Sequence, residues 1–341
     1  MSDIADRTGV SQATVSLVLN HAQGTRISAV TRNRVLAAAL ELGYQKLAQP
    51  HDTGRVIGLL INELTTSQHV AGLLEGVRDE AAANDCLVTV ISTQGTPEVE
   101  GEALDYLMAR PLIGIIYATL LTQAVKPPDK LRDVPTVLLN CHAVKDHYTS
   151  VVPGDVSGGF TATSALIDAG HSRIAMINGE DWIEASRDRL KGYRQALTTH
   201  DIPIDAKLIL SGGWTLASGR EQTHKLLDLH SPPTAIFCYC DRMALGAYEA
   251  VLSRGLKIPE DISIVGFDDE IFAADMAPPL TTIVLPHDAM ARWAVSRLLE
   301  SSNSPTASQK HRKMKMECEL VMRGSVATRS LLDSRERRSV K

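Results

Sequence analysis

The sequence predicts an α/β protein in which a small helical N-terminal domain precedes parallel sheets with helices on both faces. Near the N-terminus, apolar residues recur at the helical spacing i, i+3, i+4. From residue 55 on, apolar runs typical of buried strands alternate with helical stretches, which is the pattern of a parallel sheet. The alternation restarts near residue 172, so two similar halves are expected. With 341 residues, 44% of them hydrophobic, the chain can form two or three domains.

The overall composition excludes several classes of protein. A formal net charge of −5 excludes a wholly basic nucleic-acid-binding protein but not a local basic surface. The chain has no run of about 18 apolar residues and no secretory signal pattern, so we expect a cytoplasmic protein without a membrane-spanning segment. The five cysteines form no C-x-x-C pair, which argues against a disulfide framework and a zinc ribbon. We therefore expect neither a metal nor a cofactor.

The first two predicted helices have a helix-turn-helix pattern. Val15, Val18 and Leu19 recur at the spacing that places them on one inward face. Ser11 stands where the N-cap of the second helix belongs, because its hydroxyl can accept a hydrogen bond from an unpaired helix amide. Gly9 suits the tight turn between the two helices. The side chains left on the outer face are polar or small, except for a leucine at position 17.

A third helix is predicted from residue 29, with Ser28 as its cap and Gly43 as its C-terminal stop. Residues 1–46 contain five basic and three acidic residues, so the sign of the charge is reversed locally. Arg26, Arg32 and Arg34 flank the start of the third helix, where arginine side chains and helix-start amides can hold phosphates. The same spacing is also compatible with an ordinary three-helix domain whose arginines are solvated.

The segment GVSQATVSLVLN, followed by TRNRVLAAALELGY, resembles the DNA-binding headpiece of the lactose-repressor (LacI-type) family of transcription regulators. The resemblance implies that the headpiece, residues 1–46, binds a near-palindromic double-stranded operator. Position 17 departs from many relatives, which carry an arginine there, because leucine offers only apolar contact, for example to a thymine methyl group. The residues implied to face DNA are Gln12, Ala13 and Leu17 at base-reading positions, Ser11, Thr14, Ser16 and Asn20 at phosphate-facing or turn-holding positions, and Arg26 and Arg32.

Two further departures concern the ends of the headpiece. Relatives have several residues, including a threonine cap, ahead of SDIADRTG, which suggests a start codon upstream of Met1. The linker, residues 47–55, is several residues shorter than in relatives, and Pro50 and Gly54 disfavour a regular helix. Leu47 is then the candidate for an apolar wedge in the minor groove. Either Leu47 inserts into the operator, or the protein bends its operator less than relatives do.

The body of the chain resembles the same family over almost its whole length. GDVSGGFTATSALIDAGHSRIAMING, RDRLKGYRQAL, CDRMALGAYEAVLSRGLKIPEDISIVGFDD and PPLTTI stand in the family's order. The resemblance implies a periplasmic-binding-protein-like core, residues 56–330, built of two Rossmann-like lobes with a ligand in the cleft between them. We expect the N-lobe to contain residues 56–155 and 285–310, the C-lobe residues 156–284 and 311–330, and a tail to follow over residues 331–341.

Polar residues at predicted strand ends are the candidates for effector binding, because open parallel sheets bind ligands beyond the carboxyl ends of their strands. An arginine fork and a carboxylate can hydrogen-bond neighbouring hydroxyls, and an indole can cover the apolar face of a pyranose, so the set suits a sugar. Cys240 replaces an asparagine frequent in relatives, and a purine or nucleoside is the alternative ligand. The candidates are Asn62, Glu63, Asn140, Trp214, Asp241 and Asp268 at strand ends and Arg189 in the R-L-x-G-Y pattern.

A headpiece joined to a two-lobe sensor implies a transcription regulator that acts as a repressor and whose affinity for its operator changes when a small molecule binds. No leucine-heptad tail follows Arg323, so a homodimer is expected. A cytoplasmic enzyme built on the Rossmann-like lobes is one rival, but no G-x-G-x-x-G fingerprint, P-loop or nucleophile elbow follows a predicted strand. A sugar-binding protein without a role on DNA is the other rival, and the helix-turn-helix pattern opposes it.

Overall fold

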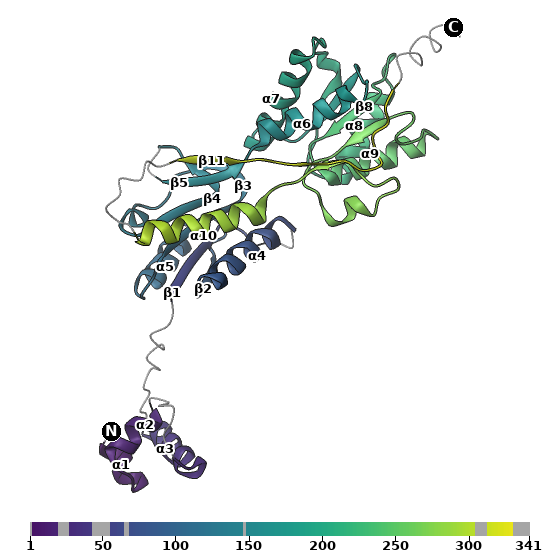
Figure 1. The fold of residues 1–341 in the computed structure, drawn as a ribbon. Coiled ribbons are helices and arrows are strands. Elements are labelled where there is room, and N and C mark those ends of the chain that lie inside the picture. Colours follow the sequence, from purple (N-terminus) through teal and green to yellow (C-terminus); the bar gives the residue numbers. More distant parts are fainter. Residues whose placement is uncertain are drawn as a thin grey trace. The chain divides into compact units, whose positions relative to one another are not determined.

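The computed structural model describes residues 2–19, 27–42, 55–64, 68–145, 148–303 and 312–329 (Figure 1). The chain forms two compact units, Met1–Gly54 and Arg55–Lys341, which are considered separately below. Asn20, Arg26 and Leu47, the linker residues 47–54 and the tail 331–341, for which the sequence made predictions, lie outside the described residues.

The headpiece is a three-helix domain, as predicted. Its helices are α1 (Ser2–Thr8), α2 (Gln12–Leu19) and α3 (Ala29–Glu41). Ile4, Val15 and Val35 are completely buried in one core shared by the three helices. The predicted caps are present, because the hydroxyls of Ser11 and Ser28 accept hydrogen bonds of 3.1 Å from the third backbone N–H after each of them. In each of α2 and α3, one of the first four backbone N–H groups, which have no partner within the helix, thereby receives a side-chain acceptor.

The N-lobe is a six-stranded parallel sheet in the order β11-β5-β4-β3-β1-β2. Alternate residues of β1 point to opposite faces: Leu59 packs with α4 and α10, and Leu60 packs with α5. Figure 1 shows α4 and α10 side by side on one face. The elements are β1 (Arg55–Ile61), α4 (Gln68–Ala83), β2 (Cys86–Ser92), α5 (Pro97–Met108), β3 (Gly114–Val125), η1 (Asp129–Asp133), β4 (Thr136–Ala143), β5 (Thr149–Pro153), α10 (His287–Asn303) and β11 (Lys313–Met316).

The C-lobe has a four-stranded parallel sheet in the order β7-β6-β8-β9. Helices α6 and α7 cover one face, and α8 and α9 cover the other. A short antiparallel ribbon of β10 and β12 completes this lobe. The elements are α6 (Asp155–Asp168), β6 (Ile174–Asn178), α7 (Glu184–Thr199), η2 (Ala206–Leu208), β7 (Ile209–Ser211), α8 (Leu216–Leu227), β8 (Ala235–Cys238), α9 (Asp241–Ser253), β9 (Ser263–Val265), η3 (Ile271–Ala274), β10 (Thr282–Ile283) and β12 (Leu320–Val321).

The chain passes between the lobes three times, and the last passage differs from the prediction. We expected residues 311–330 in the C-lobe, but β11 pairs with β5 in the N-lobe sheet, from Lys313 opposite Ser150 to Met316 opposite Pro153. The crossing therefore lies at residues 317–319, between β11 and β12. The strand KMKM was not recognised because an edge strand is half exposed and lacks the continuous apolar run of a buried one.

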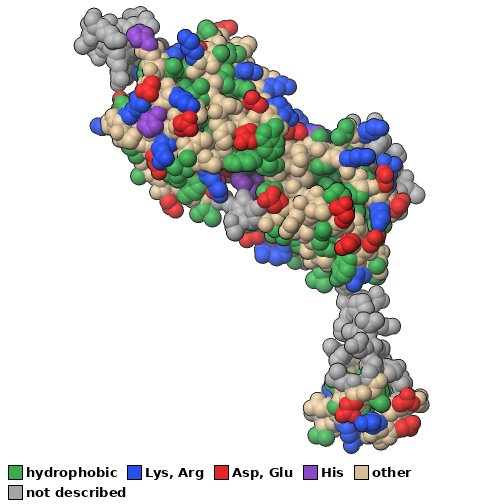
Figure 2. Space-filling model, turned by 180° about the vertical axis from the view of Figure 1, so that it is seen from behind, with side chains coloured by type: hydrophobic (Ala, Val, Ile, Leu, Met, Phe, Trp, Pro, Cys, Tyr) green, Lys and Arg blue, Asp and Glu red, His purple; other side chains and the backbone are tan. Residues whose placement is uncertain are grey.

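The surface carries charges of both signs. Figure 2 shows basic and acidic side chains interspersed over the visible face of both lobes. Among the residues that the structure describes, no helix is long and apolar enough to cross a membrane.

Candidate functional site: the outer face of α2 and the interlobe cavity

The outer face of α2 presents the side chains at the predicted base-reading positions. Gln12 and Ala13 are exposed, and Leu17 is 37% exposed. The hydroxyls of Ser11 and Thr14 lie 2.9 Å apart and Ser11 caps the helix, so of its two predicted roles Ser11 has the turn-holding one. Ser16 and Arg32 are half-buried. Ser16 remains a predicted phosphate-facing or turn-holding residue, and Arg32 remains a predicted phosphate contact.

A cavity of about 400 Å³ lies between the two lobes of the core. Both lobes supply its wall, which contains more apolar than charged side chains. The volume is of the size that holds a small organic ligand. The polar or charged wall residues are Glu63, His69, Thr122, Asn140, Arg189, Arg242, Asp268, Glu270 and His287, and the remaining ones are Leu120, Leu121, Pro153, Ile183, Ala185, Trp214, Tyr239, Cys240 and Leu285.

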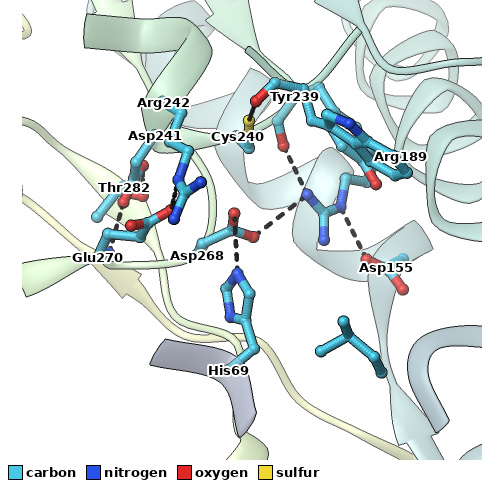
Figure 3. Close-up of polar contacts among 12 residues, drawn as sticks. His69, Asp155, Arg189, Tyr239, Cys240, Asp241, Arg242, Asp268, Glu270 and Thr282 are labelled. Carbon is cyan, nitrogen blue, oxygen red and sulfur yellow. Dashed lines mark hydrogen bonds and ion pairs between the residues drawn. The ribbon is translucent and has the colours of Figure 1, made fainter. Parts of the chain in front are cut away.

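Arg189 is the most deeply held charge of the cavity. It projects from α7 and donates to Asp155 Oδ1 at 2.8 Å and to the carbonyl oxygen of Tyr239 at 2.5 Å (Figure 3). Its guanidinium lies 3.5 Å from Asp268 Oδ1 and stacks 3.5 Å from the centroid of the Phe267 ring. Burial alone would lower the pKa of Arg189, but Asp155, Tyr239 and Asp268 raise it overall. The guanidinium is therefore a permanent cation in fixed orientation.

The ionisation state of Asp268 depends strongly on its surroundings in the cavity. Its backbone N–H donates to the carbonyl of Ile283 at 2.7 Å, which fixes the loop after β9 to β10. Burial raises the pKa of Asp268 to about 7, because it outweighs the opposing effect of Arg189. The second oxygen, Oδ2, lies 3.7 Å from Nε2 of His69, which comes from α4 of the other lobe. A bound ligand can therefore decide whether this carboxyl group is ionised.

Two histidines that the sequence analysis did not select also line the cavity. The rings of His69 and His287 meet edge to face with centroids 5.1 Å apart. Burial lowers the pKa of both rings, that of His287 to about 3, so they are neutral at physiological pH. Both stand in the first turn of a helix and not at a strand end, which is why the strand-end rule missed them.

His69 also belongs to a group with possible metal ligands, where the sequence predicted none. One ligand atom each of His69, Asp268 and Glu270 lie within 4.8 Å of one another. Both carboxylates already face a cation, since Arg242 Nε donates to Glu270 at 2.9 Å and Arg189 pairs with Asp268. The arginines therefore compete with any metal ion for these oxygens.

The structure brings five of the seven predicted effector residues to the cavity wall. They are Glu63, Asn140, Arg189, Trp214 and Asp268. The amide of Asn140 is occupied, because it donates to the carbonyl of Thr119 at 3.0 Å and accepts from the hydroxyl of Thr122 at 2.7 Å. The Trp214 indole is 38% exposed and meets Trp182 edge to face at 6.0 Å.

Asn62 and Asp241 lie off the wall, in contrast to the prediction. Asn62 Oδ1 accepts from the backbone N–H of Leu120 at 2.9 Å and thereby anchors the neighbouring strand. The Asp241 carboxylate accepts from the hydroxyl of Thr282 at 2.6 Å and from the backbone N–H of Glu270 at 2.8 Å. Both side chains are engaged in hydrogen bonds within the protein, and neither is among the residues that line the cavity.

Comparisons with known proteins agree with the two units. Residues 1–46 match the model of bacterial regulatory proteins of the lacI family, and residues 163–326 match that of a periplasmic binding protein-like domain. The HTH-type transcriptional repressor CytR of Escherichia coli K12 is 33% identical over 338 residues, which cover 97% of this chain and 96% of the repressor. The chain belongs to the lacI family of bacterial regulatory proteins.

This lacI-family chain is also similar to other repressors and to solved structures of regulators. The repressor PurR of Vibrio vulnificus is 30% identical, covering 96% of this chain and 98% of PurR. The structure of the lac repressor dimer bound to operator and the anti-inducer ONPF has a TM-score of 0.70 at 28% identity, covering 95% and 98%. The CelR–cellobiose complex has a TM-score of 0.65 at 27% identity, with the same coverage. These relatives are regulators and not enzymes, and this chain is a helix-turn-helix transcription regulator with an effector domain.

Proposed function

We propose that this protein is a cytoplasmic repressor that binds a near-palindromic operator as a homodimer and responds to a sugar or sugar derivative in the interlobe cavity. The cavity carries the proposal, because side chains of both lobes meet there around Arg189 and Asp268. A ligand that contacts both lobes changes their arrangement only by its differential affinity for the two arrangements. The similar lac repressor structure, a dimer bound to its operator and to an anti-inducer, supports the proposal that DNA and a small molecule bind to the same dimer.

Gln12 is expected to contribute to operator discrimination. Replacing Gln12 by alanine removes a side chain that can form two hydrogen bonds with one adenine, so discrimination at one base pair should fall about tenfold or more. The operator is first selected from a random duplex library with the wild-type protein, and fluorescence anisotropy then compares it with single-base variants. Asn33→Ala, at an exposed position of α3, is the matched control. Unchanged discrimination in Gln12→Ala removes this residue from the base-reading set.

The proposed effector class follows from the polar residues of the cavity. Arg189 and Asp268 suit adjacent hydroxyls, and the indole of Trp214 suits the apolar face of a pyranose. Leu120, Leu121 and Leu285 leave an apolar wall that favours a second candidate, a nucleoside or purine with a flat base. A thermal-shift screen over sugars, sugar phosphates, nucleosides and purines separates the two classes, since a ligand of the folded state raises the melting temperature.

Effector affinity is expected to increase with pH and to level off above about 7, because Asp268, with a pKa of about 7, becomes ionised there. Hydroxyl groups that donate to this carboxylate require its ionised form, and below its pKa binding must release a proton. Well below pH 7, the dissociation constant should therefore rise about tenfold for each unit by which the pH is lowered. Above pH 7 it should be constant. Calorimetric titration of the screening hit in buffers of different ionisation enthalpy measures both the affinity and the released proton. A profile equally flat in the wild type and in Asp268→Asn contradicts the assignment.

A further inference from the structure

Glu184 connects the two lobes outside the cavity wall. It is the first residue of α7 in the C-lobe and stands between Ile183 and Ala185, which line the cavity. Both of its carboxylate oxygens lie 2.9 Å from Nε2 of His142, on β4 of the N-lobe. Nζ of Lys313, on β11 of the same lobe, lies 3.6 Å from Oε1. One C-lobe carboxylate is therefore held by two N-lobe side chains.

The contact gains free energy only while the lobes are together. The side chains of Glu184 and His142 are 21% and 20% exposed, so the lobe arrangement of this structure removes most of their water. Burial alone would raise the pKa of Glu184, but His142 and Lys313 lower it overall, which keeps the carboxylate ionised. Separation of the lobes breaks both contacts at once and leaves three groups to be solvated again. Removing one partner in the assembled arrangement leaves the others desolvated and unpaired, so such a substitution should disfavour closure.

The effector does not compete directly for this contact. Glu184, His142 and Lys313 are all absent from the cavity wall, so a ligand there does not displace them. A second His–carboxylate pair between the lobes, His69 with Asp268, lies inside the cavity, where a ligand competes for it. The interlobe connection through Glu184 therefore acts on the lobe equilibrium before any ligand binds.

We propose that Glu184, His142 and Lys313 form an interlobe clamp that sets the population of the closed lobe arrangement and thereby the effector affinity. The three residues are positioning residues, because they act on the ligand only through closure. The inference rests on the lobe movement of the proposed function. Removing the clamp is expected to lower the closed population relative to the open one about tenfold, with a loss of effector affinity of up to the same factor.

The test measures the distance between the lobes directly. Nitroxide labels are placed on Glu102→Cys in the N-lobe and Thr199→Cys in the C-lobe, both exposed positions of the full chain. The five native cysteines are buried, so the label reacts with the introduced ones. Electron double-resonance distances are recorded with excess unlabelled protein, which restricts them to one subunit. The variants compared are Glu184→Gln, Lys313→Met and the charge swap Glu184→Lys with Lys313→Glu.

The matched control is Glu221→Gln. Glu221 has the same chemistry and pairs with Lys225 at 2.7 Å, but within one helix of one lobe. We expect Glu184→Gln and Lys313→Met to shift the distances toward the open arrangement and the control to leave them unchanged. The charge swap should restore them in part, because it re-forms the pair between positions 184 and 313 but not the contact with His142. If Glu184→Gln melts at a lower temperature and is partly unfolded, the distances in Lys313→Met test the clamp instead, because Lys313 is exposed and its substitution should not disturb the fold.

Two outcomes overturn the clamp. Either Glu184→Gln and Lys313→Met keep the wild-type distances, or the control shifts them as much. An added arm with cellobiose, D-ribose and adenosine separates the clamp from the proposed function. If one of these compounds moves the lobes of the wild type but the substitutions do not, only the clamp is wrong. If neither compounds nor substitutions move them, the clamp is wrong and none of the three compounds is an effector that moves the lobes.

Discussion

Asp268→Asn is expected to weaken effector binding at least about 100-fold while leaving the protein folded. The substitution removes the charge that accepts ligand hydroxyls and keeps the size of the side chain. Asparagine also tolerates the positive φ of 115° at this position, and the backbone hydrogen bond to Ile283 is retained. Calorimetric titration gives the affinity, and the melting temperature without ligand reports on the fold.

The neighbouring carboxylate provides the control for Asp268→Asn. Asp269 also has a positive φ, of 55°, but it pairs with Arg323 at 2.7 Å and does not line the cavity. Asp269→Asn should therefore bind the effector as the wild type does. Undiminished binding in Asp268→Asn, or equal losses in both variants, shows that the carboxylate is not a ligand contact.

Features determined by local sequence were predicted correctly. The caps Ser11 and Ser28 depend on residues only three positions away, and the strand–helix alternation depends on burial along one segment. Asp268 was found because the carboxyl ends of parallel strands gather at one edge of a sheet, whichever residues follow them. Arg189, which lies within α7, was found from the R-L-x-G-Y pattern of the family resemblance.

Features determined by distant parts of the chain were missed. The strand-end rule placed Asp241 at the right edge, but its side chain turns to Thr282, which is 41 residues away. His69 and His287 face each other only because α4 and α10, more than 200 residues apart in the sequence, pack side by side. The edge position of β11 likewise depends on β5, with which it pairs. The hydrophobic periodicity within a single segment cannot predict such contacts between distant segments.

Arg189→Met is expected to destabilise the core by ~3–5 kcal/mol, besides abolishing effector binding. The guanidinium is only 4% exposed and compensates two buried carboxylates, those of Asp155 and Asp268. Methionine fills a similar volume but leaves Asp155 without its 2.8 Å partner. Urea unfolding followed by circular dichroism measures the free energy of unfolding of the core.

The double variant Arg189→Met with Asp155→Asn distinguishes the loss of a charge partner from the loss of packing. If the orphaned carboxylate causes the damage, neutralising Asp155 should recover part of the stability, so that the two effects are not additive. Arg220→Met is the control, because its pair with Glu249 is about half exposed and such pairs contribute roughly 0–1 kcal/mol. Equal effects of Arg189→Met and Arg220→Met exclude a structural role for Arg189. A large difference means that loss of effector binding in any Arg189 variant has two causes, so that Asp268→Asn is the test that isolates the ligand contact.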